Sequence, residues 1–218
     1  ALSNDGGRSL FGETPIIQQG EGYDFSHPIE GVYTGHNAFT GIGPPVIREE
    51  GLLLFPISRT ALDENGSYFN PYNSSYMDAG CLAARMSGDR LITESVTWII
   101  PDAKRTTRGI FEPTLAALDG SRILMVMRGS NDKRPELPAH KWYAISEDQG
   151  RTWGAVKPWS YDDGRCFFSP SSISHLVPYS DGRLFWFGNI SQQNANGNSP
   201  RYPLLMGEIN RATGLLRR

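Results

Sequence analysis

The sequence predicts an all-β fold of short antiparallel strands, and two observations support that prediction. First, the 218 residues include 24 glycines and 15 prolines, so turns are frequent, whereas stretches rich in Ala, Leu, Glu and Lys that favour helices are few. Second, a pattern of strand, Asp-Gly turn and strongly apolar strand recurs along the chain. Hydrophobic residues make up 39% of the chain, which is enough to fill a core between sheets.

Each repeat opens with a predicted β-hairpin. Residues 111–129, "FEPTLAALDGSRILMVMRG", and residues 168–189, "FSPSSISHLVPYSDGRLFWFGN", both read Phe, a polar residue, Pro, a strand, Asp-Gly and an apolar strand. Residues 36–58, "HNAFTGIGPPVIREEGLLLFPIS", are a weaker copy in which Glu50-Gly51 replaces Asp-Gly. Glycine accepts the positive φ that a tight hairpin turn demands, so each turn joins two paired strands.

Further strands follow each hairpin. Third strands are expected at residues 80–86, 140–146 and 202–209, and fourth strands at residues 91–100 and 154–160. Four antiparallel strands per repeat indicate the blades of a β-propeller, over about residues 32–100, 108–160 and 166–218, the last blade lacking its fourth strand. Residues 1–30 form an unassigned N-terminal segment. Three blades cannot close a ring, so we expect part of a six-bladed or similar propeller; alternatively residues 1–30 supply strands, or two chains complete each other.

The turn between the third and fourth strands of the middle repeat has a recognisable motif. Residues 146–153, "SEDQGRTW", resemble the Asp-box (BNR repeat), S-x-D-x-G-x-T-W, of sialidases and related propellers. Ser146, Asp148, Gly150, Thr152 and Trp153 all match. Asp148 is expected to accept bonds from backbone N–H groups, Gly150 to supply a positive φ, and Trp153 to pack between blades. The motif is structural, and it occurs in sialidases, other glycosidases, polysaccharide lyases and non-enzymatic binders.

The sialidase resemblance implies a site on the face opposite this turn, where first strands start, second strands end, and long loops lead into third strands. Arginines recur there, and converging guanidinium groups bind carboxylates, so they predict an acidic sugar. The candidates for substrate binding are Arg59, Arg108, Arg128, Arg165, Asn189 and Arg201, with Arg108 and Arg128 as the preferred pair. Some of these arginines could instead form salt bridges with Glu112, Asp78 or Asp102.

Three residues are candidates for catalysis: Glu112 as a base or as the partner of a tyrosine, His36 as a proton shuttle, and Tyr202 on the loop face. His140, beside Lys141, is expected at the surface. The Phe/Tyr-Arg-Ile-Pro motif of sialidases does not occur in this sequence. The resemblance therefore carries over neither the full arginine triad nor the aspartate acid and tyrosine nucleophile.

The leading hypothesis is a sialidase-like glycoside hydrolase that acts on a sialic or uronic acid. In a sialidase mechanism arginines hold the substrate carboxylate while a Tyr/Glu pair attacks the anomeric carbon. One alternative is a polysaccharide lyase or uronate-directed glycosidase in which His36 and Tyr202 transfer protons. The other is a non-catalytic propeller that binds glycans or proteins.

The composition of the chain limits the kinds of partner and ligand that we expect it to bind. The formal charge of −2 gives no field for nucleic acid, and no apolar run approaches the roughly 18 residues of a membrane span. No phosphate-binding loop or zinc spacing occurs, so no cofactor and no metal is expected. Cys81 and Cys166 form one bridge or stay as two buried thiols. Because the chain starts Ala-Leu-Ser without Met or a visible targeting segment, we expect a mature or excerpted product, secreted or periplasmic, and a homo-oligomer if the chain is complete.

Overall fold

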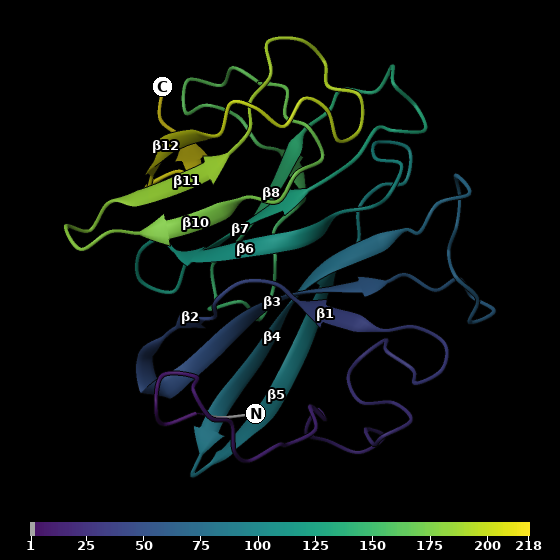
Figure 1. Ribbon diagram of the computed structural model, residues 1–218, viewed down its shortest axis with the longest axis vertical. Coiled ribbons are helices and arrows are strands. Elements are labelled where there is room, and N and C mark those ends of the chain that lie inside the picture. Colours follow the sequence, from purple (N-terminus) through teal and green to yellow (C-terminus); the bar gives the residue numbers. More distant parts are fainter. Residues whose placement is uncertain (1–2) are drawn as a thin grey trace.

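The computed structural model describes residues 3–218, which form three antiparallel β-sheets (Figure 1). The first sheet contains β1 (Phe39–Gly41), β2 (Val46–Ile47), β3 (Leu52–Thr60), β4 (Met77–Ser87) and β5 (Arg90–Ile99). The second contains β6 (Phe111–Ala117), β7 (Ile123–Arg128), β8 (Lys141–Ser146) and β9 (Lys157–Pro158). The third contains β10 (His175–Pro178), β11 (Leu184–Gly188), β12 (Leu205–Asn210) and β13 (Leu215–Leu216). The predicted all-β class and three successive antiparallel sheets are confirmed.

The strand order within each sheet follows the chain, as the repeats predict. The first strand of the first sheet is divided, because Pro44 and Pro45 lack backbone N–H groups; β1 and β2 both pair with β3. The 3-10 helix η1 (Glu49–Gly51) makes the turn at Glu50-Gly51. None of the helical structure within residues 3–218 has the length and apolar character to cross a membrane.

Two strand predictions are corrected. The third sheet has a fourth strand, β13, which the sequence does not predict for that blade; Ile209 pairs with Leu216. The third strand of the same sheet begins at Leu205 and not at Tyr202, because Pro203 cannot donate a ladder hydrogen bond. Residues 3–218 thus form one five-stranded and two four-stranded sheets, and these sheets do not close into a ring.

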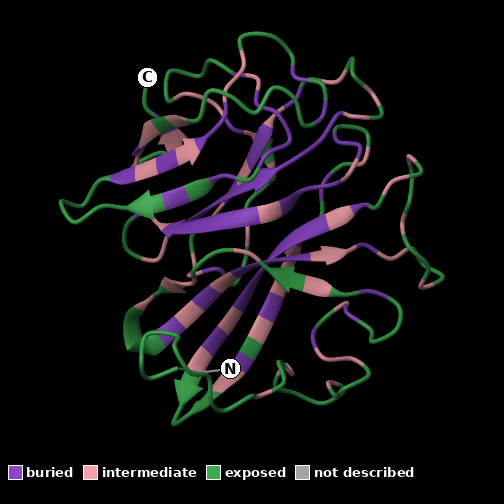
Figure 2. Ribbon diagram, in the orientation of Figure 1, coloured by how far each residue is buried: buried purple, intermediate pink, exposed green. Residues whose placement is uncertain are grey.

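The sheets share two cores. In Figure 1 the first sheet fills the lower half and the second and third sheets lie together above it, with β6 packed against β3 and β10. One core joins the first and second sheets through Leu54, Cys81 and Met125. The other joins the second and third sheets, where Trp159 meets Trp186 edge-on at 5.3 Å. Figure 2 shows buried residues concentrated in the strands and exposed residues in the loops.

The 146–153 turn has the expected hydrogen bonds. Asp148 Oδ1 accepts a bond of 2.8 Å from the Thr152 amide, and Ser146 Oγ accepts one of 2.7 Å from the Gly150 amide. Gly150 has φ +83°. Trp153 Nε1 donates to Thr97 Oγ1 of β5 at 3.1 Å, so the indole links the second sheet to the first. These predictions are confirmed.

The same hydrogen bonds recur in the N-terminal segment, which our sequence prediction leaves unassigned. Residues 3–10, "SNDGGRSL", form a turn that we call the 3–10 turn after its residue numbers. Asp5 Oδ1 accepts a bond of 2.9 Å from the Ser9 amide, and Ser3 Oγ accepts one of 2.7 Å from the Gly7 amide. Ser9 stands in place of Thr152. Farther along, the Gln19 amide donates to the Thr93 carbonyl at 2.8 Å, so the segment runs beside β5.

Both cysteines are free thiols, so the structure has neither the bridge nor the pair of buried thiols that we considered. Cys81 is buried in the first core, and burial raises the pKa of its thiol to about 12. Cys166 is exposed, because it lies in the loop before β10. The prediction of a buried thiol is therefore right for Cys81 and wrong for Cys166.

Candidate functional site

The candidate site lies where the second strand of each sheet ends and the long loop to the third strand begins. In the second sheet, β7 ends at Arg128 and β8 returns from Lys141 to Ser146, so the arginine end and the 146–153 turn occupy opposite ends of the sheet. The long loops after β3, β7 and β11 follow the right-hand and upper margins of Figure 1. The same register occurs in two sheets: Phe39 pairs with Arg59, and Phe111 pairs with Arg128.

Arg108, Arg128 and Arg201, which we call the arginine cluster, come together around two residues. The guanidinium carbons of Arg108 and Arg128 lie 5.5 and 4.5 Å from the ring centre of Phe111. Arg128 Nε donates to Ser171 Oγ at 2.8 Å, and Arg201 Nη2 donates to the Ser171 carbonyl at 3.0 Å. The preferred pair, Arg108 and Arg128, therefore does converge, and Arg201 joins it from the loop after β11.

Glu112 is the carboxylate bound to this cluster. Its Oε2 accepts a hydrogen bond from Arg128 Nη1, which makes a salt bridge between side chains that are 18% and 9% exposed. Its backbone has φ +48° at a break in the β6–β7 register, and the amide donates to Ser58 Oγ at 2.9 Å. Such a φ is uncommon for a residue other than glycine and costs on the order of 1–3 kcal/mol, so the surroundings must hold it.

Lys141 is the buried cation beside the arginine cluster. It is the cross-strand partner of Arg128, and it is fully buried. Its ammonium is bound by oxygens of Pro170 and Ser172. Burial, and then the charge of Arg128, lower the pKa of Lys141 to about 7, against a smaller opposite effect of Glu112. The neighbouring His140, which we expected at the surface, is partly buried, and its pKa is lowered by burial.

A second buried ion pair lies at the matching place in the first sheet. Arg59 Nε donates to Asp78 Oδ2 at 3.1 Å, and the guanidinium carbon of Arg59 is 4.6 Å from the Trp98 ring centre. Burial raises the pKa of Asp78, and Arg59 opposes that rise. The pair lines a pocket of about 530 Å³ together with Tyr76 and Phe69. Arg59 and Arg128 thus form two of the salt bridges that the sequence allowed, whereas Asp102 accepts a bond from the Lys104 amide.

Besides Arg59, four predicted site residues lie outside the arginine cluster. His36 is exposed, with Nδ1 3.4 Å from the Gly66 carbonyl. Tyr202 is 78% exposed, and its loop is held by Asn189, whose amide nitrogen donates to the backbone carbonyls of residues 201 and 203. Arg165 pairs with Asp163 in an exposed turn, with Nε 2.8 Å from Oδ2.

Sequence reasoning gave no role to Ser171 and Lys141. Both lie in the segments assigned to the site face, at the start of the third repeat and the start of β8. Their contacts with the arginine cluster and with each other's segments depend on packing between sheets that no local pattern specifies. The register, in which Lys141 stands opposite Arg128, is the signal that places it.

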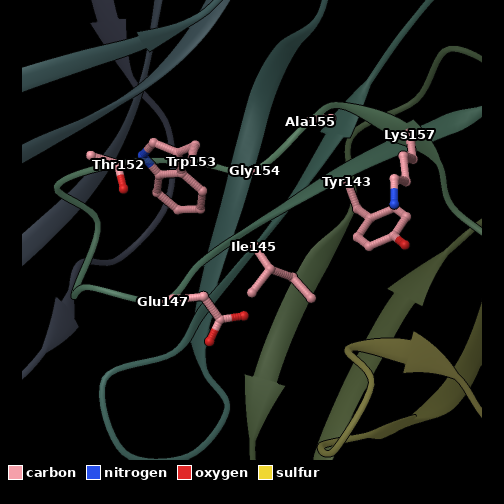
Figure 3. A pocket seen from close by; sticks show the side chains of 8 residues that line it. All are labelled: Tyr143, Ile145, Glu147, Thr152, Trp153, Gly154, Ala155 and Lys157. Atoms are coloured by element: carbon pink, nitrogen blue, oxygen red, sulfur yellow. The ribbon is translucent and has the colours of Figure 1, made fainter.

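Another hollow lies toward the opposite end of the second sheet (Figure 3). It has a volume of about 400 Å³ and lies between β8 and residues 152–157. The Gly154 amide donates to the Ile145 carbonyl of β8, and the chain diverges from β8 beyond that bond. Figure 3 shows Tyr143 and Lys157 at one end and Trp153 at the other. The carboxylate of Glu147 in its wall is paired with Arg122 at 3.3 Å, so charged groups do not converge there as they do at the arginine cluster.

Neither a protein-family model nor a curated protein matches the chain. Among solved structures, the K499G mutant of NanB sialidase from Streptococcus pneumoniae has a TM-score of 0.46 and 19% identity, covering 79% of this chain and 22% of that chain. The GH43_1 enzyme from Xanthomonas citri complexed with xylotriose has a TM-score of 0.53 and 12% identity, covering 83% of this chain and 54% of that enzyme. This chain spans about a fifth of the first and about half of the second. The likeness to the GH43_1 enzyme shows a shared fold.

Proposed function

We propose that the chain forms part of a sialidase-like glycoside hydrolase that acts on a sugar bearing a carboxylate, a sialic or uronic acid. The observation that carries the proposal is the convergence of Arg108 and Arg128 on Phe111, beside Glu112. The hydrogen bonds of the 146–153 turn and their recurrence in the 3–10 turn support the assignment of both as Asp-boxes. The fold shared with the GH43_1 enzyme is consistent with a carbohydrate-active protein.

The charge balance supports an anionic ligand. Arg108 and Arg128 lie at Phe111, Arg201 binds Ser171 and Lys141 lies opposite Arg128. Among the residues that the structure describes, the one carboxylate bound to this group is that of Glu112. The Nε of Arg108 is buried without a hydrogen-bond partner within residues 3–218. Arginine binds a carboxylate through two parallel N–H groups, so a substrate carboxylate would both balance the charge and occupy free donors.

Glu112 is the residue that we assign to the chemical step. Arg128 holds its carboxylate, and Ser58 holds its backbone. From that place it would act at the anomeric carbon, either directly or by polarising a hydroxyl nucleophile. His36 and Tyr202, the proton carriers of the lyase hypothesis, lie outside the cluster, and this placement supports hydrolysis over elimination.

A substrate screen of the full-length protein tests the proposal. Fluorogenic sialosides and glucuronides are compared with the matching neutral glucosides, and unsaturated products are followed by ultraviolet absorbance. We expect hydrolysis of an acidic glycoside and none of its neutral counterpart. Preference for the neutral glycoside contradicts the anion site, an unsaturated product indicates a lyase, and binding without turnover indicates the non-catalytic alternative.

A further inference from the structure

Lys141 has an unusual environment for a charged residue. Its side chain is fully buried at the start of β8. Nζ donates to the Pro170 carbonyl at 3.3 Å, to Ser172 Oγ at 3.2 Å and to the Ser172 carbonyl. These three oxygens match the three N–H donors of an ammonium group, and none of them is a carboxylate. Burying an ammonium without an opposite charge is costly, whereas a methionine of similar length would fill the space cheaply.

The three oxygens belong to the residues on either side of Ser171. Ser171 is the residue shared by two members of the arginine cluster: its Oγ accepts from Arg128 Nε, and its carbonyl accepts from Arg201 Nη2. The ammonium therefore holds residues 170–172 through the two outer residues. Ser171 between them accepts hydrogen bonds from the guanidinium groups of Arg128 and Arg201. Removing the ammonium leaves the carbonyls of Pro170 and Ser172 without this donor and allows the peptide to shift.

We propose that Lys141 is a positioning residue for the anion site, which holds Ser171 in the place where it orients Arg128 and Arg201. The identity of the anion rests on the proposed function; the positioning does not. The first sheet supports the inference by contrast. There the register partner of Arg59 is Asp78, which neutralises that arginine, whereas Lys141 adds charge beside Arg128 and keeps the cluster positive.

The arrangement also makes anion binding depend on pH. The charged groups that act on Lys141 are Arg128 and Arg201, which lower its pKa, and Glu112, which raises it. A bound carboxylate would offset the two arginines and raise the pKa of Lys141, so binding would take up a proton near neutral pH. Affinity for the anion is therefore expected to fall as the pH rises through about 7.

The test compares Lys141→Met, which removes all donors, with Lys141→Gln, which retains two. Lys157→Met in the exposed β9 is the matched control. Solvent exchange of the Arg128 Nε–H is measured by NMR without any ligand. We expect Lys141→Met to accelerate this exchange about tenfold, the effect of one ordinary hydrogen bond, and Lys141→Gln to accelerate it less. In kinetics with an acidic glycoside, KM rises in Lys141→Met, and the dependence of KM on pH near neutrality disappears.

The outcomes separate this inference from the proposed function. A folded Lys141→Met protein with unchanged Arg128 Nε–H exchange overturns the positioning role. If both variants fail to fold, Ser172→Ala, which removes only one acceptor of the Lys141 ammonium, replaces them, and unchanged Arg128 Nε–H exchange in the folded Ser172→Ala protein overturns the role. If Lys141→Met loosens Arg128 but no acidic glycoside is hydrolysed, the positioning role stands and the proposed hydrolase function fails.

Discussion

The backbone amide of Glu112 donates a hydrogen bond to the hydroxyl of Ser58 across 2.9 Å, from the first strand of one sheet to the second strand of its neighbour. Ser58 is 1% exposed. The bond therefore lies inside the interface between the sheets, and it holds the backbone of a residue with φ +48°. The position of the candidate catalytic carboxylate depends on how two sheets pack.

Removal of that acceptor should loosen Glu112. We expect Ser58→Ala to lower the free energy of unfolding by about 1–3 kcal/mol, because a buried amide loses its partner. The kcat of the acidic-glycoside reaction should fall as well. Urea unfolding and steady-state kinetics measure the two effects. Ser87→Ala, at an exposed strand end, is the control, and equal behaviour of the two variants would contradict the role of Ser58.

Glu112→Gln should abolish most of the activity while the protein remains folded. The amide has the shape of the carboxylate but cannot act as a base, and loss of such a group lowers the rate by roughly 10²–10⁴-fold. The measurement is kcat at the optimal pH. Glu94→Gln removes the partner of Arg85 in a more exposed salt bridge on β5 and should leave kcat unchanged. A Glu112→Gln protein with the activity of the wild type would exclude a chemical role for this residue.

The glycine of the 146–153 turn gives a prediction about stability alone. Gly150 has φ +83° and Gly164 has φ +86°, so alanine at either position costs about 1–2 kcal/mol of backbone energy. A Cβ at position 150 would also lie 3.3 Å from Cys81 Sγ, whereas one at position 164 meets nothing within 4 Å. Thermal unfolding should therefore show a larger loss for Gly150→Ala than for Gly164→Ala. Equal losses would mean that the turn does not pack on the first sheet as described.

Asp5 reports on the 3–10 turn. Hydrogen bonds from the side chain and backbone of Ser9, and from Ser3, lower the pKa of Asp5 to about 2. The folded turn should therefore keep this carboxylate ionised at a pH where the unfolded chain has protonated it, so the turn weakens as the pH falls toward 2. Carboxyl NMR titration measures the midpoint. Ser9→Ala should raise it and Asn4→Ala should not; an ordinary midpoint in the unaltered protein would contradict the turn.

The sequence predicts the strands and turns of each sheet because the patterns that specify them are local. Alternating strands, glycines at hairpin turns and the match at residues 146–153 each depend on neighbours a few positions away. The same locality explains the convergence of Arg108 and Arg128, since both flank β6 or β7 of one sheet. The sequence does not specify the strand end at Pro203 or the strand β13, because short strands carry little pattern.

The rest of the site depends on contacts between sheets. Nothing near Lys141 in the sequence says that its ammonium meets the segment before β10, and an adjacent lysine and histidine suggest a surface. His36 and Tyr202 have the right residue types at plausible strand starts, yet loop conformation places them elsewhere. The 3–10 turn does not match the motif in sequence, because serine and leucine replace the threonine and tryptophan.

The 3–10 and 146–153 turns share one property with a wider consequence. The hydrogen bonds that the two turns have in common close within a seven-residue stretch, from Ser3 to Ser9 and from Ser146 to Thr152. These shared hydrogen bonds need no partner outside the turn. The same turn can therefore recur in successive sheets while the loops at the opposite ends of the sheets vary in sequence. Proteins of one fold can then differ in specificity without a change in the turns that join their strands.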